Sequence, residues 1–570
     1  MYGTTWKTSE RAFTPERHED MDIPVSDGIT INTDIVRPAE DGRFPAILCV
    51  HAYSKEDQYA AIKPTAMSMK RGHIEAGDPQ FFARRGYAHV VANIRGTGKS
   101  TGFFGNLDSR SIQDIAEVIE WLAAQPWCNG RVGMFGVSYF AIVQQRVAAL
   151  EPPSLKAIFA PYGWTDAYRD RYYRGGILSH AFMRSWMPTV DNPKLPPAEG
   201  NSSDSSRAAR AQELLNDEEL SQVPFLVNAL KSPDQGFNRV LLDVLLNPLD
   251  GEYYRERSVK PTVSPKVPAY LGGCWGIYGL HLPGAFRSWD QWGASKKLTI
   301  GPPIYLDRPV YQYHNEALRW FDHWLKDIDT GLLDEKPVQI YIDGTGEWRE
   351  AEDWPLPETR WTPFYLHENG LLLEREHWPN EGSSTFEDSP YGHGRLSFQT
   401  PPAVELTEIC GPISLDLYAS TTDVEVLWFV SLHHVDSEGN ERLLTRGWLR
   451  GSQRALDEER SKPWQPVHSH NARKPLVPGE TYLFNIEVRP YGIQLKPGEA
   501  LKMTIACADD ELPPNVLHAI ASGSVARRTS SRVTVQHNDQ FPSRLWLPIT
   551  RGNRIGFFLS GGQLPGIGLE

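Results

Sequence analysis

Short apolar runs alternate with helical segments along the first 175 residues. Four such runs predict buried strands, at residues 46–50, 87–92, 132–135 and 156–160. Apolar residues keep helical spacing over 112–122, after a capping Ser109, and a second helical stretch covers 141–150. Strands that alternate with helices usually pair in parallel and are covered on both faces. The pattern therefore predicts an α/β domain built on a mostly parallel sheet.

The pattern changes further along the chain. Residues 176–262 mix helical runs with a polar loop at 201–206, which indicates a helical insertion. Strands then return at 267–271 and 298–300, followed by a helix over 318–325. We therefore expect the α/β domain in two parts, 1–175 and 263–335, with the insertion between them.

From about Pro337 onward, short alternating runs recur between turn signals. They lie at residues 338–342, 413–418, 424–432, 482–488 and 501–506, with a turn at 436–439. Many short strands with Gly and Pro turns predict an all-β sandwich of jelly-roll type over residues 336–570.

Composition and charge exclude several classes of protein. The 58 Lys and Arg against 71 Asp and Glu give a net charge of −13, which argues against a nucleic-acid partner. No apolar stretch approaches the roughly 20 residues that cross a bilayer, and the polar N-terminus does not resemble a secretory signal. The five cysteines are far apart and form no CxxC pair. We expect a cytoplasmic protein without a membrane partner, a metal site or a cofactor.

The sharpest local feature is the segment Gly136-Val137-Ser138-Tyr139-Phe140, which follows a predicted strand and opens a predicted helix. A nucleophile elbow needs this context, because its tight turn exposes the serine hydroxyl at the carboxyl edge of the sheet. The N–H of Tyr139 would then serve an oxyanion hole. The usual pattern ends in Gly where this chain has Phe140, so an ordinary strand–helix turn is the alternative.

A second loop, His51-Ala52-Tyr53-Ser54-Lys55, follows another predicted strand. Ligands of open α/β sheets lie outside the carboxyl ends of the strands, so the Tyr53 hydroxyl could donate to a developing oxyanion. Packing of Tyr53 within the loop is the alternative. The segment Gly98-Lys99-Ser100 looks like the end of a phosphate-binding loop, but Asn93 stands where that motif needs Gly. A structural turn is the better interpretation there.

These segments resemble the cocaine-esterase-like / X-Pro dipeptidyl-peptidase family of α/β-hydrolases, and the match runs nearly end to end. The similar segments are RGTGKS at 95–100, QPW at 125–127, VGMFGVSY at 132–139, AYSK at 52–55, FDHWLK at 321–326, RALD at 454–457 and PGE at 478–480. The resemblance implies an α/β-hydrolase domain with an inserted helical cap and a C-terminal jelly-roll. It also implies that Tyr53 supplies an oxyanion donor.

The chain departs from the family where the other triad members are expected. A serine nucleophile needs a His to take its proton and a carboxylate to orient that His, in the chain order Ser, Asp, His. The resemblance places the Asp in the segment 273–281, where Ile277 occupies the aligned position. It places the His after the strand at 298–300, where Gly301 and Tyr305 occupy the two aligned positions. His281 is the best substitute, with a hydrogen-bonded structural His as the alternative.

Other side chains are expected to border the same cleft. Asp166 is one of them, and its alternative is a structural ion pair with Arg169 or Arg171. The predicted catalytic group is Ser138, Tyr53, Tyr139 and His281. The predicted substrate-binding residues are His51, Trp164, Asp166, Trp275, Tyr278 and Tyr305.

Three functions remain open on these residues. The first is a hydrolase that acts through Ser138 on an ester or amide bond of a small molecule, which the 18 Trp and 22 Tyr suggest is apolar. The second is a non-hydrolytic catalyst of cyclisation, elimination or rearrangement, which needs positioning rather than a nucleophile. The third is a non-catalytic ligand-binding protein. The sequence does not set the oligomeric state, so a homo-oligomer also stays open.

Overall fold

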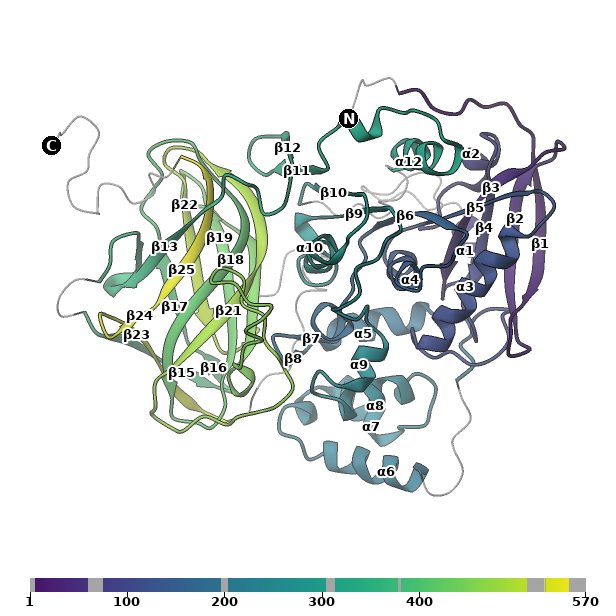
Figure 1. Ribbon diagram of the computed structural model, residues 1–570. Helices are drawn as coiled ribbons and strands as arrows, with labels where there is room; N and C mark the ends of the chain where they lie inside the picture. Colours follow the sequence, from purple (N-terminus) through teal and green to yellow (C-terminus); the bar gives the residue numbers. More distant parts are fainter. Residues whose placement is uncertain are drawn as a thin grey trace.

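Figure 1 shows a computed structural model of the protein, with an α/β body, a group of helices beneath it and a separate β-rich body. The structure describes residues 6–59, 75–195, 203–303, 313–377, 381–509, 527 and 529–552. Among these residues, no helix is long and apolar enough to cross a membrane.

In the described part of the α/β body, ten strands form one sheet in the order β1-β2-β4-β3-β5-β6-β9-β10-β11-β12. Neighbours from β4 to β11 pair in parallel, while β1, β2 and β12 run antiparallel. Its strands are β1 (Pro15–Pro24), β2 (Thr30–Pro38), β3 (Phe44–His51), β4 (Ala88–Asn93), β5 (Cys128–Phe135), β6 (Leu155–Pro161), β9 (Ala269–Cys274), β10 (Lys296–Gly301), β11 (Val338–Ile342) and β12 (Glu347–Ala351). The predicted parallel sheet is therefore confirmed.

Side-chain alternation along the strands gives the sheet two apolar faces. On β3, Ala46, Leu48 and Val50 join one core cluster, while Ile47 and Cys49 join the other. Helices cover both faces of the sheet (Figure 1). The helices of this body are α1 (Lys55–Tyr59), α2 (Pro79–Ala83), α3 (Ser109–Ala123), α4 (Tyr139–Ala148), α10 (Leu282–Gln291) and α12 (His314–Lys326). The N-cap of α3 is Asp108, one residue before the expected Ser109, and its carboxylate accepts the Ser111 N–H at 2.9 Å.

The loop that resembled a phosphate-binding motif is held by ion pairs. Arg95 forms a two-point contact with the fully buried Asp114, at 2.6 and 2.8 Å, and a third bond to Asp27 at 2.6 Å. The structural interpretation of this turn therefore fits the geometry.

The inserted segment is helical, and it joins the body through a short hairpin. The hairpin strands are β7 (Tyr173–Arg174) and β8 (Ile177–Leu178), preceded by a π-helical turn, Tyr168–Tyr172. The cap helices are α5 (His180–Trp186), α6 (Ser203–Leu214), α7 (Pro224–Lys231), α8 (Asn238–Leu246) and α9 (Glu252–Glu256). Short 3-10 turns lie at Met187–Thr189, Leu220–Gln222, Trp275–Ile277, Leu332–Asp334, Glu368–Gly370 and Gly451–Gln453.

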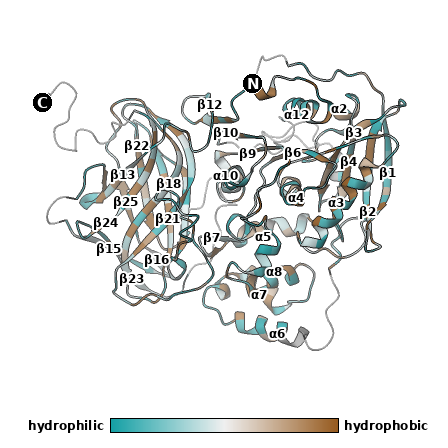
Figure 2. Cartoon of the chain, viewed as in Figure 1, coloured by the Kyte–Doolittle hydropathy of each residue, from teal (hydrophilic) through white to brown (hydrophobic). Residues whose placement is uncertain are grey.

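The C-terminal body is an all-β domain, with thirteen strands among its described residues, and Figure 2 shows hydrophobic and hydrophilic residues alternating along them. They are β13 (Arg360–His367), β14 (Leu371–Leu373), β15 (Ser383–Ser389), β16 (Gly392–His393), β17 (Arg395–Gln399), β18 (Thr407–Thr421), β19 (Leu427–Val435), β20 (Glu441–Arg450), β21 (Tyr482–Leu495), β22 (Ala500–Ala506), β23 (Ser531–Asn538), β24 (Phe541–Pro542) and β25 (Arg544–Arg551).

One strand assignment was wrong. Residues 338–342 were predicted to open the C-terminal sandwich, but β11 pairs in parallel with β10 and extends the α/β sheet. Strand β12 pairs with β11 on the same sheet. The α/β sheet therefore continues to Ala351, beyond the domain boundary expected at residue 335. Alternation predicts a strand but does not say which sheet it joins.

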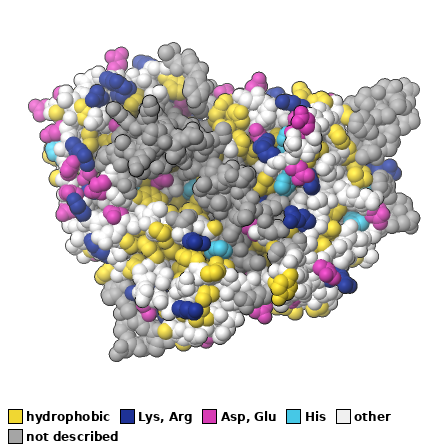
Figure 3. Space-filling model, turned by 180° about the vertical axis from the view of Figure 1, so that it is seen from behind, with side chains coloured by type: hydrophobic (Ala, Val, Ile, Leu, Met, Phe, Trp, Pro, Cys, Tyr) yellow, Lys and Arg dark blue, Asp and Glu magenta, His cyan; other side chains and the backbone are white. Residues whose placement is uncertain are grey.

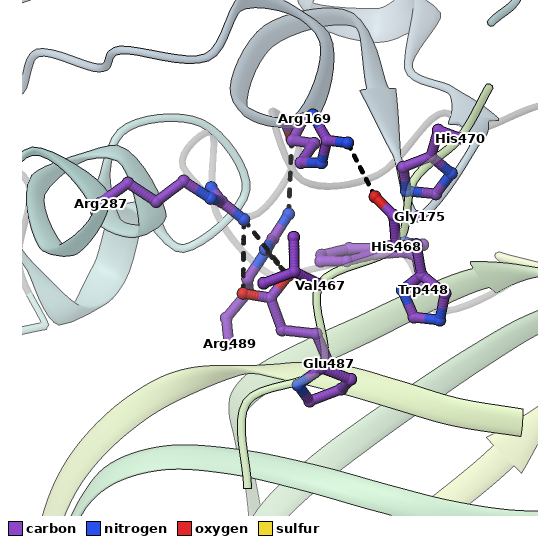
Figure 4. Close-up of a pocket in the computed structure, with 10 residues that line it drawn as sticks. Arg169, Gly175, Arg287, Trp448, Val467, His468, His470, Glu487 and Arg489 are labelled. Atoms are coloured by element: carbon purple, nitrogen blue, oxygen red, sulfur yellow. Dashed lines mark hydrogen bonds and ion pairs between the residues drawn. The ribbon is translucent and has the colours of Figure 1, made fainter. Parts of the chain in front are cut away.

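A buried polar network joins the cap, the α/β body and the C-terminal domain (Figure 4). Arg287 of α10 pairs with Asp170 and with Glu487 of β21, and Glu487 also pairs with Arg489. The cavity between these groups has a volume of about 20 Å³, the size of a single water molecule, so it is too small for a substrate.

On the face seen in Figure 3, Lys and Arg side chains are scattered among acidic ones.

Candidate active site

Four loops meet at the carboxyl edge of the parallel sheet. Tyr53 follows β3, Ser138 follows β5, the π-helical turn follows β6 and His281 follows β9. These strands are neighbours in the order β3-β5-β6-β9, so their carboxyl ends lie side by side (Figure 1). This is the edge where open α/β sheets bind their ligands.

Ser138 lies on a strained turn between β5 and α4. Its backbone has φ +59° and ψ −121°, a region that residues with a side chain rarely adopt. Gly136, two residues earlier, leaves room for the turn, because a Cβ there would lie 2.9 Å from the carbonyl oxygen of Glu75. Phe140 takes the position of the usual second Gly and stacks on His51 with ring centroids 4.9 Å apart. The turn therefore has the geometry of a nucleophile elbow despite its departure from the motif.

His281 lies next to Ser138. Its Nε2 is 3.3 Å from the Ser138 Oγ, within the range of a loose hydrogen bond in an enzyme without substrate. The backbone of His281 is fixed on both sides, since its N–H donates to Ile277 and its carbonyl accepts from Ala285 in α10. Pro283 in the first turn of α10 favours a helix start directly after His281.

No described residue places a carboxylate beside His281, where a triad normally has one to orient the histidine. Among the described residues, its buried Nδ1 has no hydrogen-bond partner. Ile277, at the position aligned with the family Asp, is buried in an apolar cluster. The candidate base therefore comes from the loop in which the resemblance places the acid, one strand earlier than the resemblance places the His.

Burial keeps His281 neutral. Loss of hydration lowers its pKa to about 3, and the positive charge of Arg171 acts in the same direction. A neutral imidazole can accept the Ser138 proton on Nε2 only when Nδ1 carries its own proton. A base with so low a pKa is weak, which limits catalysis in the resting enzyme.

We expect the pH profile of kcat/KM for ester hydrolysis to lack the usual histidine inflection near 6.5. The base form persists down to the lowered pKa of His281, so activity should stay flat from pH 8 to about 5. Stability behaves differently, because the unfolded histidine takes up a proton below about 6.5 and folded His281 does not. The free energy of unfolding should therefore decrease as the pH is lowered from about 6.5 to 3. Initial-rate assays with a neutral ester would measure the pH profile of kcat/KM, and acid unfolding curves would measure the stability. An inflection of kcat/KM at pH 6–7 would contradict the assignment of His281 as the base.

The Tyr53 hydroxyl is positioned by Trp186 of the cap helix α5. The indole Nε1 of Trp186 donates to the Tyr53 hydroxyl oxygen at 3.0 Å, so the hydroxyl proton remains available to donate elsewhere. Burial, reinforced by the charge of Glu75, raises the pKa of Tyr53 well above its usual value, so the group stays protonated. Trp186 also stacks on Tyr139, and sequence reasoning missed it because nothing in the pattern of a helical insertion marks one tryptophan.

Two more of the predicted site residues, Tyr139 and His51, have rings next to that of Tyr53. Tyr139 begins α4, so its N–H has no carbonyl one turn back within the helix. Its buried hydroxyl has no hydrogen-bond partner among the described residues. His51 is fully buried, and its Nδ1 accepts the Tyr53 N–H at 3.0 Å. This bond therefore fixes the backbone of the loop that carries Tyr53.

The remaining predicted binding residues make structural contacts. Both carboxylate oxygens of Asp166 accept from Arg169, which fits the ion-pair alternative. Trp164 is buried against α10, where the Cβ of a residue replacing Gly284 would lie 2.8 Å from its Cα. Tyr305 lies outside the described residues.

Two further predicted residues pack against the C-terminal domain. The Trp275 indole donates to the carbonyl of Tyr341 at 2.6 Å, and its ring lies 5.4 Å from that of Tyr491. Tyr278 stacks on Trp448 of β20 with centroids 6.5 Å apart. These contacts hold the loop that carries His281 against the β domain.

The fold and the serine–histidine contact define an enzyme of the α/β-hydrolase class. The model of the X-Pro dipeptidyl-peptidase (S15 family) matches residues 27–304, and that of the X-Pro dipeptidyl-peptidase C-terminal non-catalytic domain matches residues 330–545. The chain belongs to this family of hydrolases, together with the cocaine-esterase-like enzymes.

Individual relatives agree with this placement. A CocE/NonD family hydrolase from Staphylococcus aureus has 25% sequence identity and a TM-score of 0.77, over 94% of this chain and 93% of that one. The cocaine esterase of a Rhodococcus species is 27% identical over 371 residues, which cover 61% of this chain and 62% of that one. An α-amino acid ester hydrolase, at 17% identity and a TM-score of 0.72 over 96% of this chain and 99% of that one, shares the fold.

Proposed function

We propose that this protein is an esterase that hydrolyses a small, largely apolar substrate through a Ser138–His281 dyad. The observation that carries the proposal is the 3.3 Å contact between Ser138 Oγ and His281 Nε2 at a strained elbow. Membership in a family of hydrolases supports the hydrolytic reaction. Amide bonds are less suited, because a weak base gives little help to a poor leaving group.

The reaction would proceed in two halves. Ser138 Oγ attacks the ester carbonyl while its proton passes to His281 Nε2, and the imidazolium then returns that proton to the leaving alkoxide. Water repeats the sequence on the acyl-enzyme and releases the acid. The Tyr53 hydroxyl and the Tyr139 N–H would stabilise the two oxyanions.

Covalent labelling with a fluorophosphonate tests the nucleophile. We expect intact-mass analysis to show one adduct on the wild-type protein and none on Ser138→Ala, because only an activated serine displaces fluoride from phosphorus. A Ser54→Ala variant is the matched control, since Ser54 hydrogen-bonds Glu56 on the neighbouring loop, and it should be labelled like the wild type. Absence of labelling on folded protein would sink the proposal.

The non-hydrolytic alternative retains two supporting observations, both at His281. The unpaired Nδ1 of His281 and its low pKa would suit a site that only positions a reactive molecule. It predicts ligand binding without labelling, so the same experiment separates the two functions. Family membership disfavours the non-catalytic interpretation.

For the C-terminal domain, we keep the jelly-roll arrangement as a proposal on the alternating strands described above.

A further inference from the structure

Arg171 is a buried cation for which the described part of the chain offers no anionic partner. Only 4% of its surface is exposed, yet among the described residues no carboxylate forms an ion pair with it. Its neighbours differ, since Arg169 pairs with Asp166 and Asp250, and Arg287 pairs with Asp170 and Glu487. The Arg171 guanidinium instead lies over the rings of Trp186 and Tyr172, at 4.4 and 4.8 Å from their centroids. Leaving a buried charge unpaired is costly, so such a residue needs an explanation.

The position of Arg171 connects it to the reacting groups. The Trp186 ring beneath its guanidinium is the one that bonds the Tyr53 hydroxyl and stacks on Tyr139, the residue next to Ser138. The positive charge of Arg171 also helps to lower the pKa of His281. Arg171 lies on a single turn of π-helix, Tyr168–Tyr172, and such turns occur frequently at functional sites.

We propose that Arg171 determines specificity by binding a carboxylate group of the substrate beside the Ser138–His281 dyad. This inference rests on the esterase function proposed above and narrows its substrate class to apolar or aromatic esters that carry one carboxylate. Guanidinium binds carboxylate through two parallel hydrogen bonds, and among the described residues no carboxylate already occupies the guanidinium of Arg171.

The bound carboxylate would have a second effect. Its negative charge offsets that of Arg171, so imidazolium formation at His281 becomes less unfavourable when the substrate is bound. The substrate thereby supplies the charge of a triad carboxylate, which none of the described residues places at His281. A neutral ester gives no such help.

The test compares two esters that differ in one charge, 4-acetoxybenzoate and 4-acetoxybenzamide. We expect wild-type kcat/KM to favour the benzoate by at least about 10-fold, and Arg171→Met to lower its kcat/KM by about 10- to 100-fold. On the benzamide, Arg171→Met should raise kcat severalfold, because His281 loses a repelling charge. Arg171→Lys should keep part of the preference, and Arg184→Met, an exposed arginine on α5, should keep all of it.

Two measurements keep this inference separable from the esterase proposal. Benzoate should bind Ser138→Ala in calorimetry more tightly than benzamide, and Ser138→Ala with Arg171→Met should lose the difference. If Ser138→Ala shows this difference but no ester is hydrolysed and no serine is labelled, the esterase proposal fails and the anion site stands. Should wild type turn over both esters equally, or Arg171→Met lower both rates equally, Arg171 is structural and the inference is overturned. If Arg171→Met does not fold, the wild-type preference and its reduction in Arg171→Lys decide the question.

Discussion

Replacement of His281 by alanine is expected to lower kcat for ester hydrolysis by about 10³-fold, with KM changed little. Positioned proton transfer contributes roughly 10²- to 10⁴-fold, and His281 is the base within reach of the Ser138 hydroxyl at 3.3 Å. KM should hold because the histidine acts on the reacting proton rather than on the substrate body. Steady-state kinetics with 4-nitrophenyl acetate, beside fluorophosphonate labelling rates, would measure the loss. Both quantities should fall together.

Non-additivity makes this prediction specific. Residues that act as one unit lose their effect together, so Ser138→Ala with His281→Ala should be no slower than Ser138→Ala alone. Imidazole added to His281→Ala should restore part of the activity, since the side chain leaves a space beside Ser138. Wild-type activity in His281→Ala would assign the proton to another group and return His281 to the structural alternative.

The candidate nucleophile could be predicted because its signal is local. A glycine two residues before Ser138, a strand before it and a helix after it are all encoded within a few positions. The same holds for Tyr53, which directly follows β3. The sheet could be predicted for the same reason, since its alternation of apolar faces is written along each strand.

The rest of the site depends on how distant loops pack. His281 could be named as a candidate from its segment, but no spacing in the chain reveals that it reaches the serine hydroxyl, 143 residues away. Arg171 could be assigned to an ion pair from its acidic neighbours, but Arg169 takes Asp166 and Arg287 takes Asp170. Trp186 belongs to the site only because helix α5 brings its indole to the Tyr53 hydroxyl. These are tertiary facts, and local pattern carries no information on them.

Replacement of Gly175 by alanine is expected to loosen the hairpin β7–β8 from the C-terminal domain. Gly175 has φ +52°, and its carbonyl accepts the N–H of Arg450 at 2.8 Å. A Cβ would lie 2.5 Å from the carbonyl carbon of Trp448 and closer still to its oxygen, so backbone must move. Backbone strain of about 1–2 kcal/mol and overpacking of about 1–3 kcal/mol should lower the free energy of unfolding by roughly 2–5 kcal/mol. Denaturant unfolding and amide exchange in β7 and β8 would measure it.

A second glycine separates the clash from the backbone strain. Gly236, in the cap, has φ +49°, and a Cβ there would meet nothing within 4 Å. Gly236→Ala should therefore cost only the strain of about 1–2 kcal/mol, without faster exchange in the hairpin. Because the hairpin directly follows the turn that carries Arg171, Gly175→Ala should also weaken the preference for 4-acetoxybenzoate, whereas Gly236→Ala should not. Equal costs for the two variants would show that the contact with Trp448 relaxes freely and that the hairpin is not held by the C-terminal domain.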